Sequence, residues 1–494
     1  MTTLHVAVVG SGPAGLYTAE ALVKQAAALD PPRHVSVDVL DRLPTPYGLV
    51  RYGVAPDHPS IKSIAEYLRG VLEHTDVRFI GGVRLGGDVT REELLACYDA
   101  VVYATGAMRD RRMGIEGEDL PGSYAATDFV NWYCGHPDTG PDTFALDAES
   151  VAVVGVGNVA VDVARILVRD PGELRPTDVS QPVLEALTAS KVREVHMIGR
   201  RGPAQAKFTT KELRELGELA GVDIVVGAGE ADPNAFDATA GGAALAESDR
   251  RVRGNLTVIG DWAARAPAGH ARRLTVRFWL RPVKIEGTER VTGLTVERTR
   301  IDENGALTGT GELETISAQM VLRSVGYQSV PLPGIPFDER THTVPNAEGR
   351  VLGPDGAPLP KEYVSGWLKR GPTGVIGTNK SDAAQTVRSL LADLAGRGGG
   401  VGASTGRGGG VEASTGRGGG AGASTAEAGD GPGPARVSLL EVLAGRDVAT
   451  VSYAGWLNVE RAEAELAAAL GRGARVKLAS RADIDALCWE IDAQ

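Results

Sequence analysis

The stretch Leu4-His5-Val6-Ala7-Val8-Val9-Gly10-Ser11-Gly12-Pro13-Ala14-Gly15 decides how the rest of the chain is interpreted. An apolar run breaks into the pattern G-x-G-x-x-G and is followed by a run rich in alanine and leucine, which predicts a strand, a tight turn and a helix over residues 16–29. Glycines in such a turn let the backbone approach a pyrophosphate, and the first amides of the helix face its phosphates. The residues expected to lie against a dinucleotide are Gly10, Gly12, Ala14 and Gly15.

An acidic residue stands where a ribose-binding acid is expected. Residues 35–40 predict the second strand, and Asp41 follows it directly. In dinucleotide-binding folds an acid about 20 residues beyond the glycines accepts a hydrogen bond from the 2′-hydroxyl of the adenosine ribose. We therefore expect Asp41 to bind this hydroxyl. The alternative is a surface aspartate that follows an ordinary glycine turn.

The same pattern recurs at Val151-Ala152-Val153-Val154-Gly155-Val156-Gly157-Asn158-Val159-Ala160, where G-x-G-x-x-A leads into a helix that ends near Arg169. After the next predicted strand, residues 195–198, the chain carries Gly199-Arg200-Arg201 in place of an acid. Guanidinium groups bind a 2′-phosphate through charge-assisted hydrogen bonds, whereas an acid would repel it. The second site is therefore expected to prefer NADP(H), with solvated surface arginines as the alternative.

Two unlike fingerprints in one chain suggest FAD in the first site and NADPH in the second, linked by hydride transfer to the flavin. Residues 321–327 resemble the strand that ends at residues 105–106, and we interpret them as the return from the second unit to the first. The predicted fold is α/β, with an NADP-binding Rossmann-like domain inserted in an FAD-binding one, as in the glutathione-reductase-like flavoproteins. The predicted boundaries are residues 1–109, 323–395 and 435–494 for the FAD-binding domain, residues 110–322 for the NADP-binding domain, and residues 396–434 for a low-complexity linker.

The composition is that of a globular protein with more than one domain. The 494 residues are 43% hydrophobic and 23% charged, and the formal net charge of -11 argues against general nucleic-acid binding. Cys97, Cys134 and Cys488 are far apart, so the chain has neither a disulfide framework nor a C-x-x-C pair. We expect no transmembrane segment, because no apolar run is long enough, and no signal peptide, because a strand begins at Leu4. A reduced, cytoplasmic setting is therefore expected.

Two glycine- and proline-rich stretches are interpreted as ligand-covering loops. The prolines and glycines of residues 43–59 predict a loop without regular structure, wrapped over a flat ligand; a plain structural loop is the alternative. Residues 371–377 lead into a helix expected over 381–395, whose start would stabilise negative charge on reduced flavin. Trp367 is expected to cover a planar ring, unless it belongs to the core.

The remaining segments give weaker predictions. Residues 208–216 predict a helix that carries Glu212 and Glu215 on one face, which alone would be a solvated face. Residues 61–73 predict a further helix. Alternating apolar and polar residues over 256–322 predict β-rich structure. The glycine-arginine-serine repeats from residue 396 predict a disordered linker, after which a folded pattern resumes with a helix over 459–470.

These motifs resemble those of the adrenodoxin-reductase-type ferredoxin-NADP reductases, a family of two-domain FAD enzymes. The resemblance implies an enzyme that takes a hydride from NADPH onto FAD and passes electrons singly to a ferredoxin-type iron-sulfur protein, whereas the residues themselves indicate only two dinucleotide sites and an arginine pair. It covers nearly the whole chain apart from residues 396–434. The matching motifs are residues 46–59, Gly157-Asn158-Val159-Ala160 followed by Asp162, residues 199–203 and residues 366–380.

The resemblance also implies roles for single residues. His58 and Glu215 would be a catalytic polar pair near the flavin that places the nicotinamide and relays protons, with a loop histidine of ordinary role as the alternative. Arg214 and nearby basic residues would dock an acidic ferredoxin. Asp41 departs from the glutamate more usual in the family, but a shorter acid can still accept the ribose bond. No metal site is expected. The implied FAD contacts are Ala14, Asp41, Leu49, Trp367, Gly374, Val375 and Ile376, and the implied NADP contacts are Val156, Gly157, Asn158, Val159, Arg200, Arg201, Glu212 and Gly374.

Other classes of protein share parts of this layout. Disulfide reductases have both fingerprints but need a reactive cysteine pair, which this sequence lacks. Small subunits of glutamate synthases usually carry cysteine-rich cluster motifs ahead of the flavin domain, whereas this chain begins at the flavin fingerprint. An NADPH-dependent flavoprotein oxidase or monooxygenase, or a non-enzymatic NADPH/FAD redox sensor, stays open as an alternative.

Overall fold

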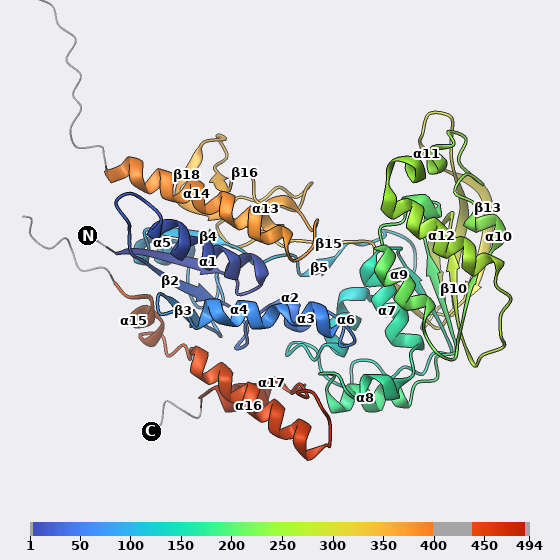
Figure 1. The fold of residues 1–494 in the computed structure, drawn as a ribbon, viewed down its shortest axis with the longest axis horizontal. Helices are drawn as coiled ribbons and strands as arrows, with labels where there is room; N and C mark the ends of the chain where they lie inside the picture. Colours follow the sequence, from blue (N-terminus) through green and yellow to red (C-terminus); the bar gives the residue numbers. More distant parts are fainter. Residues whose placement is uncertain (1–2, 399–436, 490–494) are drawn as a thin grey trace, which may run out of the picture.

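The protein consists of two lobes, each built on its own sheet (Figure 1). The structure is a computed structural model that describes residues 3–398 and 437–489. Strands from residues 4–103 and 346–364 make the first sheet, and strands from residues 123–323 make the second. The second lobe is therefore inserted in the first, as the sequence predicts. None of the helices in the described ranges is long and apolar enough to cross a membrane.

The first sheet is parallel from β18 to β3 and has an antiparallel edge formed by β16 and β17. Alternate residues of β1 (Leu4–Val9) enter two different cores. Val8 packs with the core that contains Leu16 of α1 (Pro13–Ala27), and Val9 packs with the core that contains Leu94 of α5 (Arg91–Cys97). An almost wholly apolar strand suits a sheet covered on both faces. In spatial order the strands are β16 (Asn346–Ala347), β17 (Arg350–Leu352), β18 (Pro358–Val364), β4 (Ala100–Tyr103), β1 (Leu4–Val9), β2 (Val35–Leu40) and β3 (Val77–Ile80).

The second sheet is parallel throughout. Val153 faces the core that contains Ala160 of α7 (Asn158–Val168), whereas Val154 packs with Leu294 and Val296 of a small antiparallel sheet. Helices therefore cover one face and the small sheet covers the other. The parallel strands in spatial order are β6 (Ser123–Ala125), β14 (Met320–Arg323), β7 (Ser150–Val154), β8 (Glu194–Ile198), β10 (Arg272–Arg277) and β9 (Val222–Val226), and the small sheet is β11 (Leu280–Glu286), β12 (Gly293–Ile301) and β13 (Leu307–Ser317).

The two crossings between the lobes lie side by side. β5 (Arg109–Asp110) leaves the first lobe, β15 (Tyr327–Gln328) returns to it, and the two strands pair in antiparallel register. Residues 320–323 still belong to the second sheet, so the return begins just beyond them.

The segment after residue 436 joins both lobes. Trp456 and Val459 of α16 (Tyr453–Ala469) pack in the same core as β1 of the first lobe. In Figure 1, α16 runs below that lobe towards α8 (Gln181–Thr188). Arg472 donates hydrogen bonds to the carbonyl oxygens of Arg175, Thr177 and Val179 in the second lobe, at 2.9, 2.8 and 2.7 Å. The folded pattern predicted beyond residue 434 is thus present, while most of the predicted linker, residues 399–434, lies outside the described residues.

Three expectations from the sequence need correction. The stretch 43–59 is not wholly irregular, because residues 49–52 form a single helical turn between Gly48 and Gly53, where no proline intervenes. The helix expected over 61–73 is divided at Ser63 into α3 (Pro59–Lys62) and α4 (Ile64–Leu72). Residues 256–264 are helical rather than β, as part of α12, which Asp249 caps by accepting from two backbone amides.

Helices cover the sheets and connect their strands. They are α1 (Pro13–Ala27), α2 (Leu49–Tyr52), α3 (Pro59–Lys62), α4 (Ile64–Leu72), α5 (Arg91–Cys97), α6 (Ala126–Tyr133), α7 (Asn158–Val168), η1 (Pro171–Leu174), α8 (Gln181–Thr188), η2 (Pro203–Gln205), α9 (Thr210–Gly217), α10 (Ala228–Ala231), α11 (Gly241–Ser248), α12 (Arg250–Ala264), α13 (Trp367–Arg370), α14 (Thr378–Gly398), α15 (Leu439–Ala444), α16 (Tyr453–Ala469) and α17 (Arg481–Trp489).

Candidate active site between the two lobes

The turn between β1 and α1 requires its glycines. Gly10 has φ +117°, and a Cβ atom there would lie 2.5 Å from the carbonyl oxygen of Ala104. A Cβ on Gly15 would lie 1.8 Å from the carbonyl oxygen of Gly10. α1 begins after Gly12 without a side-chain cap, so its first amides are available to an anion.

Two further segments meet this helix start. A Cβ on Gly48, the residue before α2, would lie 2.9 Å from the Cα of Gly12. A Cβ on Gly366, the residue before α13, would lie 2.4 Å from the Cβ of Ala14. The backbones therefore approach too closely for larger residues, as expected where chain segments enclose a ligand. Leu49 and Trp367, both half-buried, follow these two glycines directly.

Asp41 lies at the end of β2 beside the turn, where the sequence predicts it. Its Oδ2 accepts hydrogen bonds from the backbone amide and hydroxyl of Ser11, at 2.9 and 2.6 Å, and its Oδ1 accepts from the amide of Leu43 at 2.9 Å. Asp41 therefore stabilises the turn itself, which is a role that the sequence analysis missed.

The second turn repeats this construction. Gly155 has φ +141°, and a Cβ there would lie 2.2 Å from the carbonyl oxygen of Ser324. α7 begins after Gly157 without a side-chain cap, and the space around Gly157 is open. Residues 156–159 are half-buried, and the Oδ1 of Asn158 accepts a hydrogen bond from the amide of Thr209 at 2.8 Å, which ties this turn to the start of α9.

The two predicted phosphate-binding arginines follow β8. Arg200 and Arg201 are both exposed, and neither forms an ion pair with any residue in the described part of the chain. Two unpaired guanidinium groups at the end of this strand leave their hydrogen-bond donors to solvent or to an anionic ligand.

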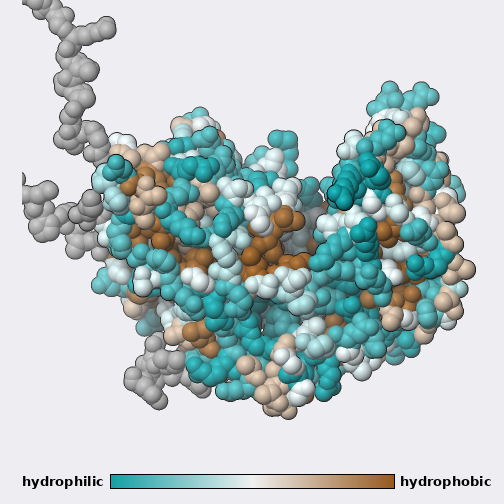
Figure 2. Space-filling model, in the orientation of Figure 1, coloured by the Kyte–Doolittle hydropathy of each residue, from teal (hydrophilic) through white to brown (hydrophobic). Residues whose placement is uncertain are grey.

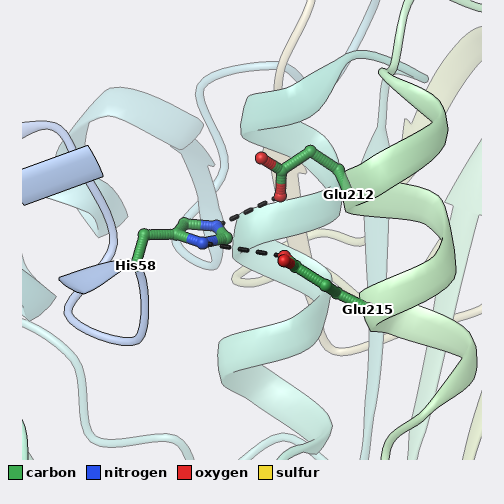
Figure 3. Close-up of side chains that lie close together, drawn as sticks. All are labelled: His58, Glu212 and Glu215. Atoms are coloured by element: carbon green, nitrogen blue, oxygen red, sulfur yellow. Dashed lines mark ion pairs between the residues drawn. The ribbon is translucent and has the colours of Figure 1, made fainter. Parts of the chain in front are cut away.

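His58, Glu212 and Glu215 come together from opposite lobes. His58 precedes α3, and both glutamates project from one face of α9, so that the imidazole ring lies between their carboxylates (Figure 3). His58 Nε2 is 3.1 Å from Glu212 Oε2, and His58 Nδ1 is 3.7 Å from Glu215 Oε2. The predicted pair of His58 and Glu215 is thus in contact, and Glu212, predicted to touch NADP, lies with it.

Three charged residues that the sequence analysis did not assign complete this cluster. Arg165 of α7 is 1% exposed, and its Nε and Nη2 donate to the two carboxylate oxygens of Asp57 at 2.6 and 3.0 Å. Its Nη2 also donates to Asp162 Oδ1 at 2.8 Å, and that same oxygen is 3.0 Å from His58 Nε2. Arg165 therefore holds Asp57 and His58 of the first lobe against Asp162 of the second.

The ligand-type atoms of His58, Glu212 and Glu215 all lie within 4.8 Å of one another. Such spacing would suit a metal ion, but Arg165 Nη2 is only 2.5 Å from His58 Nε2 and already supplies positive charge there. We therefore interpret the cluster as an ion-pair network. A pocket of about 330 Å³ adjoins the cluster, and is lined by Asp57, His58, Arg165, Arg169, Glu173, Glu215, Glu218 and Leu219.

The network changes the protonation of His58. Burial opposes the charged imidazolium, but hydrogen bonds to Asp162 and Glu212 outweigh it and raise the pKa of His58 from 6.5 to about 9. For Asp57, burial is outweighed by hydrogen bonding to Arg165, which lowers the pKa of that carboxyl. The surrounding carboxylates thus favour the charged form of His58, whereas the guanidinium of Arg165 opposes it.

This raised pKa predicts a pH-dependent contribution to stability. Because the folded pKa of His58 exceeds its ordinary value, its stabilisation is complete below pH 6.5 and is lost as the pH rises through about 9. His58→Gln should therefore lower the free energy of unfolding by about 1–2 kcal/mol at the acidic end of this window, after allowance for solvent screening. Denaturant titrations of the wild type and of His58→Gln, from pH 6.5 to about 9, measure this difference in the free energy of unfolding. His74→Gln, which removes the histidine of a half-exposed pair with Asp76, is the control. A difference between wild type and His58→Gln that does not change with pH would contradict the prediction.

The glycine-rich loop before α14 is open to solvent. Gly374 has φ +84°, and Val375 is 68% exposed, whereas Ile376 packs against the first-lobe core. The indole of Trp367 donates to the carbonyl oxygen of Thr373 at 3.2 Å, and its ring centroid is 5.7 Å from that of Tyr327. Trp367 is thus not a fully buried core residue, and it lies where the return crossing enters the first lobe.

The surface between the lobes is hollowed, with hydrophobic residues on the side of the first lobe (Figure 2). Arg214 is exposed on α9, one residue from Glu215, and Lys211 on the same helix pairs with Glu215 at 3.6 Å. Cys97, Cys134 and Cys488 are all buried, and no disulfide joins any of them.

Comparisons with known proteins agree with this architecture. Residues 4–261 match the family model described as pyridine nucleotide-disulphide oxidoreductase. NADPH-ferredoxin reductase FprA of Mycobacterium leprae is 46% identical over 79% of this chain and 84% of its own. The mitochondrial NADPH:adrenodoxin oxidoreductase of Arabidopsis thaliana is 41% identical over 79% of this chain and 82% of its own.

A solved structure of Mycobacterium tuberculosis FprA in complex with NADPH has a TM-score of 0.84 and 40% identity, and the match covers 98% of this chain and 99% of that one. Another structure of FprA from that organism, with modified NADP⁺, has the same TM-score, and the match covers 99% of this chain and 100% of that one. The family predicted from the motifs is therefore confirmed. This chain is an oxidoreductase that belongs to the family of FprA-type NADPH-ferredoxin reductases and adrenodoxin reductases.

Proposed function

We propose that this chain oxidises NADPH at the second lobe and reduces a ferredoxin-type iron-sulfur protein through an FAD held by the first lobe. The bound flavin would accept a hydride as a pair of electrons and release the electrons singly. One observation carries the proposal: an acid follows the second strand of one dinucleotide fold, and two exposed arginines that form no ion pair with the described residues stand at the equivalent place in the other.

The described residues fit an FAD in the first lobe. The uncapped start of α1 would bind the pyrophosphate, and Asp41 would accept the ribose hydroxyl with the acceptor capacity that its three hydrogen bonds leave. The close approach of Gly48 and Gly366 to α1 supports a cradle at this point. The residues that we propose to contact FAD are Gly10, Gly12, Ala14, Gly15, Asp41, Leu49, Trp367, Gly374, Val375 and Ile376.

The second lobe would bind NADPH in the corresponding way. The open space at Gly157 admits a pyrophosphate, and Arg200 and Arg201 would bind the 2′-phosphate. Asn158 already accepts from Thr209, so its side-chain amide is the part left for the nucleotide. The residues that we propose to contact NADP are Val156, Gly157, Asn158, Val159, Arg200, Arg201, Glu212 and Gly374.

His58 and Glu215 are proposed to lie beside the reacting rings and to place the nicotinamide. His58 would act there as a polar group of fixed orientation, with Glu215 and Glu212 favouring its charged form. Solvent access through the adjoining pocket would let Glu215 exchange protons with water.

His58→Gln should slow flavin reduction by NADPH about tenfold, because glutamine can still donate a hydrogen bond but carries no charge. The apparent dissociation constant of NADPH should change little, since the arginine pair is untouched. Stopped-flow measurement of flavin bleaching at saturating NADPH gives the rate, with His74→Gln as the matched control. An unchanged rate would leave His58 with a structural role only.

Further assignments follow from the same proposal. Arg214 and nearby basic residues would dock an acidic ferredoxin, an interaction that salt should weaken. The domain boundaries after residues 109, 322, 395 and 434 are proposed as the sequence predicts them. Three buried cysteines without a disulfide suit a reducing compartment such as the cytoplasm.

Anaerobic titration with NADPH tests the function directly. Purified protein should show a flavin spectrum that NADPH bleaches, and addition of an oxidised ferredoxin should restore the flavin band while the ferredoxin becomes reduced. NADH is the control for the coenzyme, and ferredoxin without enzyme is the control for direct reduction. A colourless protein that FAD cannot reconstitute, or a flavin that NADPH does not bleach, would contradict the proposal; a bleached flavin that reacts with oxygen but not with ferredoxin would indicate an oxidase.

A further inference from the structure

We propose that Thr299 is a specificity-positioning residue that holds the backbone of Arg200, so that the arginine pair can bind the 2′-phosphate of NADPH. The inference rests on the proposed function, because it takes Arg200 and Arg201 as the phosphate-binding residues. We call the turn that contains them, residues 199–202, the arginine turn.

The arginine turn needs support from its backbone. Arg200 and Arg201 are exposed and form no ion pair within the described ranges, so no charged side chain orients their guanidinium groups before a ligand arrives. Long exposed side chains have many rotamers. The peptide bond fixes the separation of the two Cα atoms, so simultaneous contact of both side chains with one phosphate depends on the backbone direction at the turn.

The neighbouring β-structure supplies that support at three successive carbonyl groups. The hydroxyl of Thr299 in β12 donates to the carbonyl oxygen of Arg200 at 2.8 Å. The amide of Trp279 donates to the carbonyl oxygen of Arg201 at 3.2 Å, and the amide of Leu280 donates to that of Gly199 at 3.0 Å. Thr299 supplies the one side chain among these contacts, so substitution can remove its hydrogen bond without changing the backbone.

The support is itself rigid. Thr299 and Trp279 are both 0% exposed, and the amide of Thr299 donates to the carbonyl oxygen of Trp279 at 2.8 Å. Trp279 has φ +60°, which is uncommon for a bulky residue, and its indole lies so close to Gly202 that a Cβ there would be 2.2 Å from the ring. This packing leaves the arginine turn little freedom on the side of the small sheet.

Thr299→Val keeps the shape of the side chain and removes the donor. The KM for NADPH should rise about fivefold to twentyfold, while the KM for NADH and kcat with either coenzyme stay within about twofold, because only NADPH uses the arginine pair. The inhibition constant of 2′,5′-ADP should rise by a similar factor, and that of 5′-AMP should not. Steady-state ferricyanide reduction by the FAD-loaded enzyme gives the KM values, the kcat values and the inhibition constants.

Two matched variants complete the test. Thr299→Ser retains the hydroxyl and should keep the wild-type preference for NADPH. Thr386→Val removes a hydroxyl that is equally buried and donates to the carbonyl oxygen of Val364 at 3.0 Å in the other lobe, and it too should keep that preference. If Thr299→Val does not yield flavin-bound protein, the same KM values are measured for Thr299→Ala, which also lacks the hydroxyl.

The result that overturns the inference is a Thr299→Val enzyme whose ratio of KM values for NADH and NADPH equals that of the wild type, or whose two KM values rise together. The Arg200→Ala/Arg201→Ala enzyme separates this failure from failure of the proposed site. If the double variant loses the preference for NADPH and Thr299→Val does not, only the positioning role fails. If the double variant keeps the preference, the phosphate-binding assignment fails first.

Discussion

Alanine at both Arg200 and Arg201 is expected to raise the KM for NADPH about a hundredfold or more and to leave the KM for NADH within about twofold. Each guanidinium would lose charge-assisted hydrogen bonds to the 2′-phosphate, worth about 1.5–3 kcal/mol each, and NADH has no such phosphate. Because neither arginine forms an ion pair in the described structure, the substitutions should leave the fold itself nearly undisturbed.

Steady-state ferricyanide reduction with both coenzymes measures the effect. Arg265→Ala, which removes an exposed arginine at the end of α12, serves as the control for a general change in surface charge. An equal rise in both KM values would show that the pair steers nucleotides non-specifically. If neither KM value changes, the 2′-phosphate binds at other residues.

Arg165→Met should lower the free energy of unfolding by about 3–5 kcal/mol, because it leaves buried carboxylates without their main cation. Asp57 would keep only Arg169, whose Nη1 is 2.6 Å from Asp57 Oδ2, and Asp162 would lose its 2.8 Å hydrogen bond. Methionine fills much of the same volume, so the loss reports charge and hydrogen bonding rather than an empty space.

Chemical denaturation of the flavin-bound protein tests this prediction, with Arg290→Met at the exposed pair with Asp147 as the control. The exposed pair should contribute less than about 1 kcal/mol. Arg165 lowers the pKa of Asp57, so the stabilisation that it provides exists above the ordinary carboxyl pKa of 3.8 and is lost as the pH falls through the lower folded value. The difference between wild type and Arg165→Met should therefore shrink in acid, and a difference that stays constant would contradict the electrostatic explanation.

The sequence predicted both dinucleotide folds because their patterns are local. An apolar strand, a glycine turn and a helix occupy adjacent residues, and each glycine meets a steric requirement visible within the motif, as at Gly10 and Gly155. The insertion of one fold in the other followed from the order of the motifs.

The errors lie where a local pattern was ambiguous. In α12 the buried positions Val252, Asn255, Ile259 and Trp262 have helical spacing, but glycine and threonine among them obscured it, and their alternation with polar residues favoured strands. Asp249, which caps the helix, was the signal that could have corrected this prediction.

The cluster around His58 could be predicted only in part. The contact of His58 with Glu215 came from the family resemblance, whereas Arg165 meets Asp57 across a separation of 108 residues and a lobe boundary. Sequence periodicity carries no information on such contacts. Asp162 and Arg165 are three residues apart on α7 and so share a face, which was the local hint available.

The contacts made by Arg472 and Trp456 have a consequence for the integrity of the molecule. The last part of the chain is held by hydrogen bonds to residues 175–179 and by packing beside β1, not by its covalent attachment to α14. A protease that nicks the backbone anywhere between Gly398 and Val437 should thus yield two polypeptides that co-migrate as a single native particle, and separate only when unfolded.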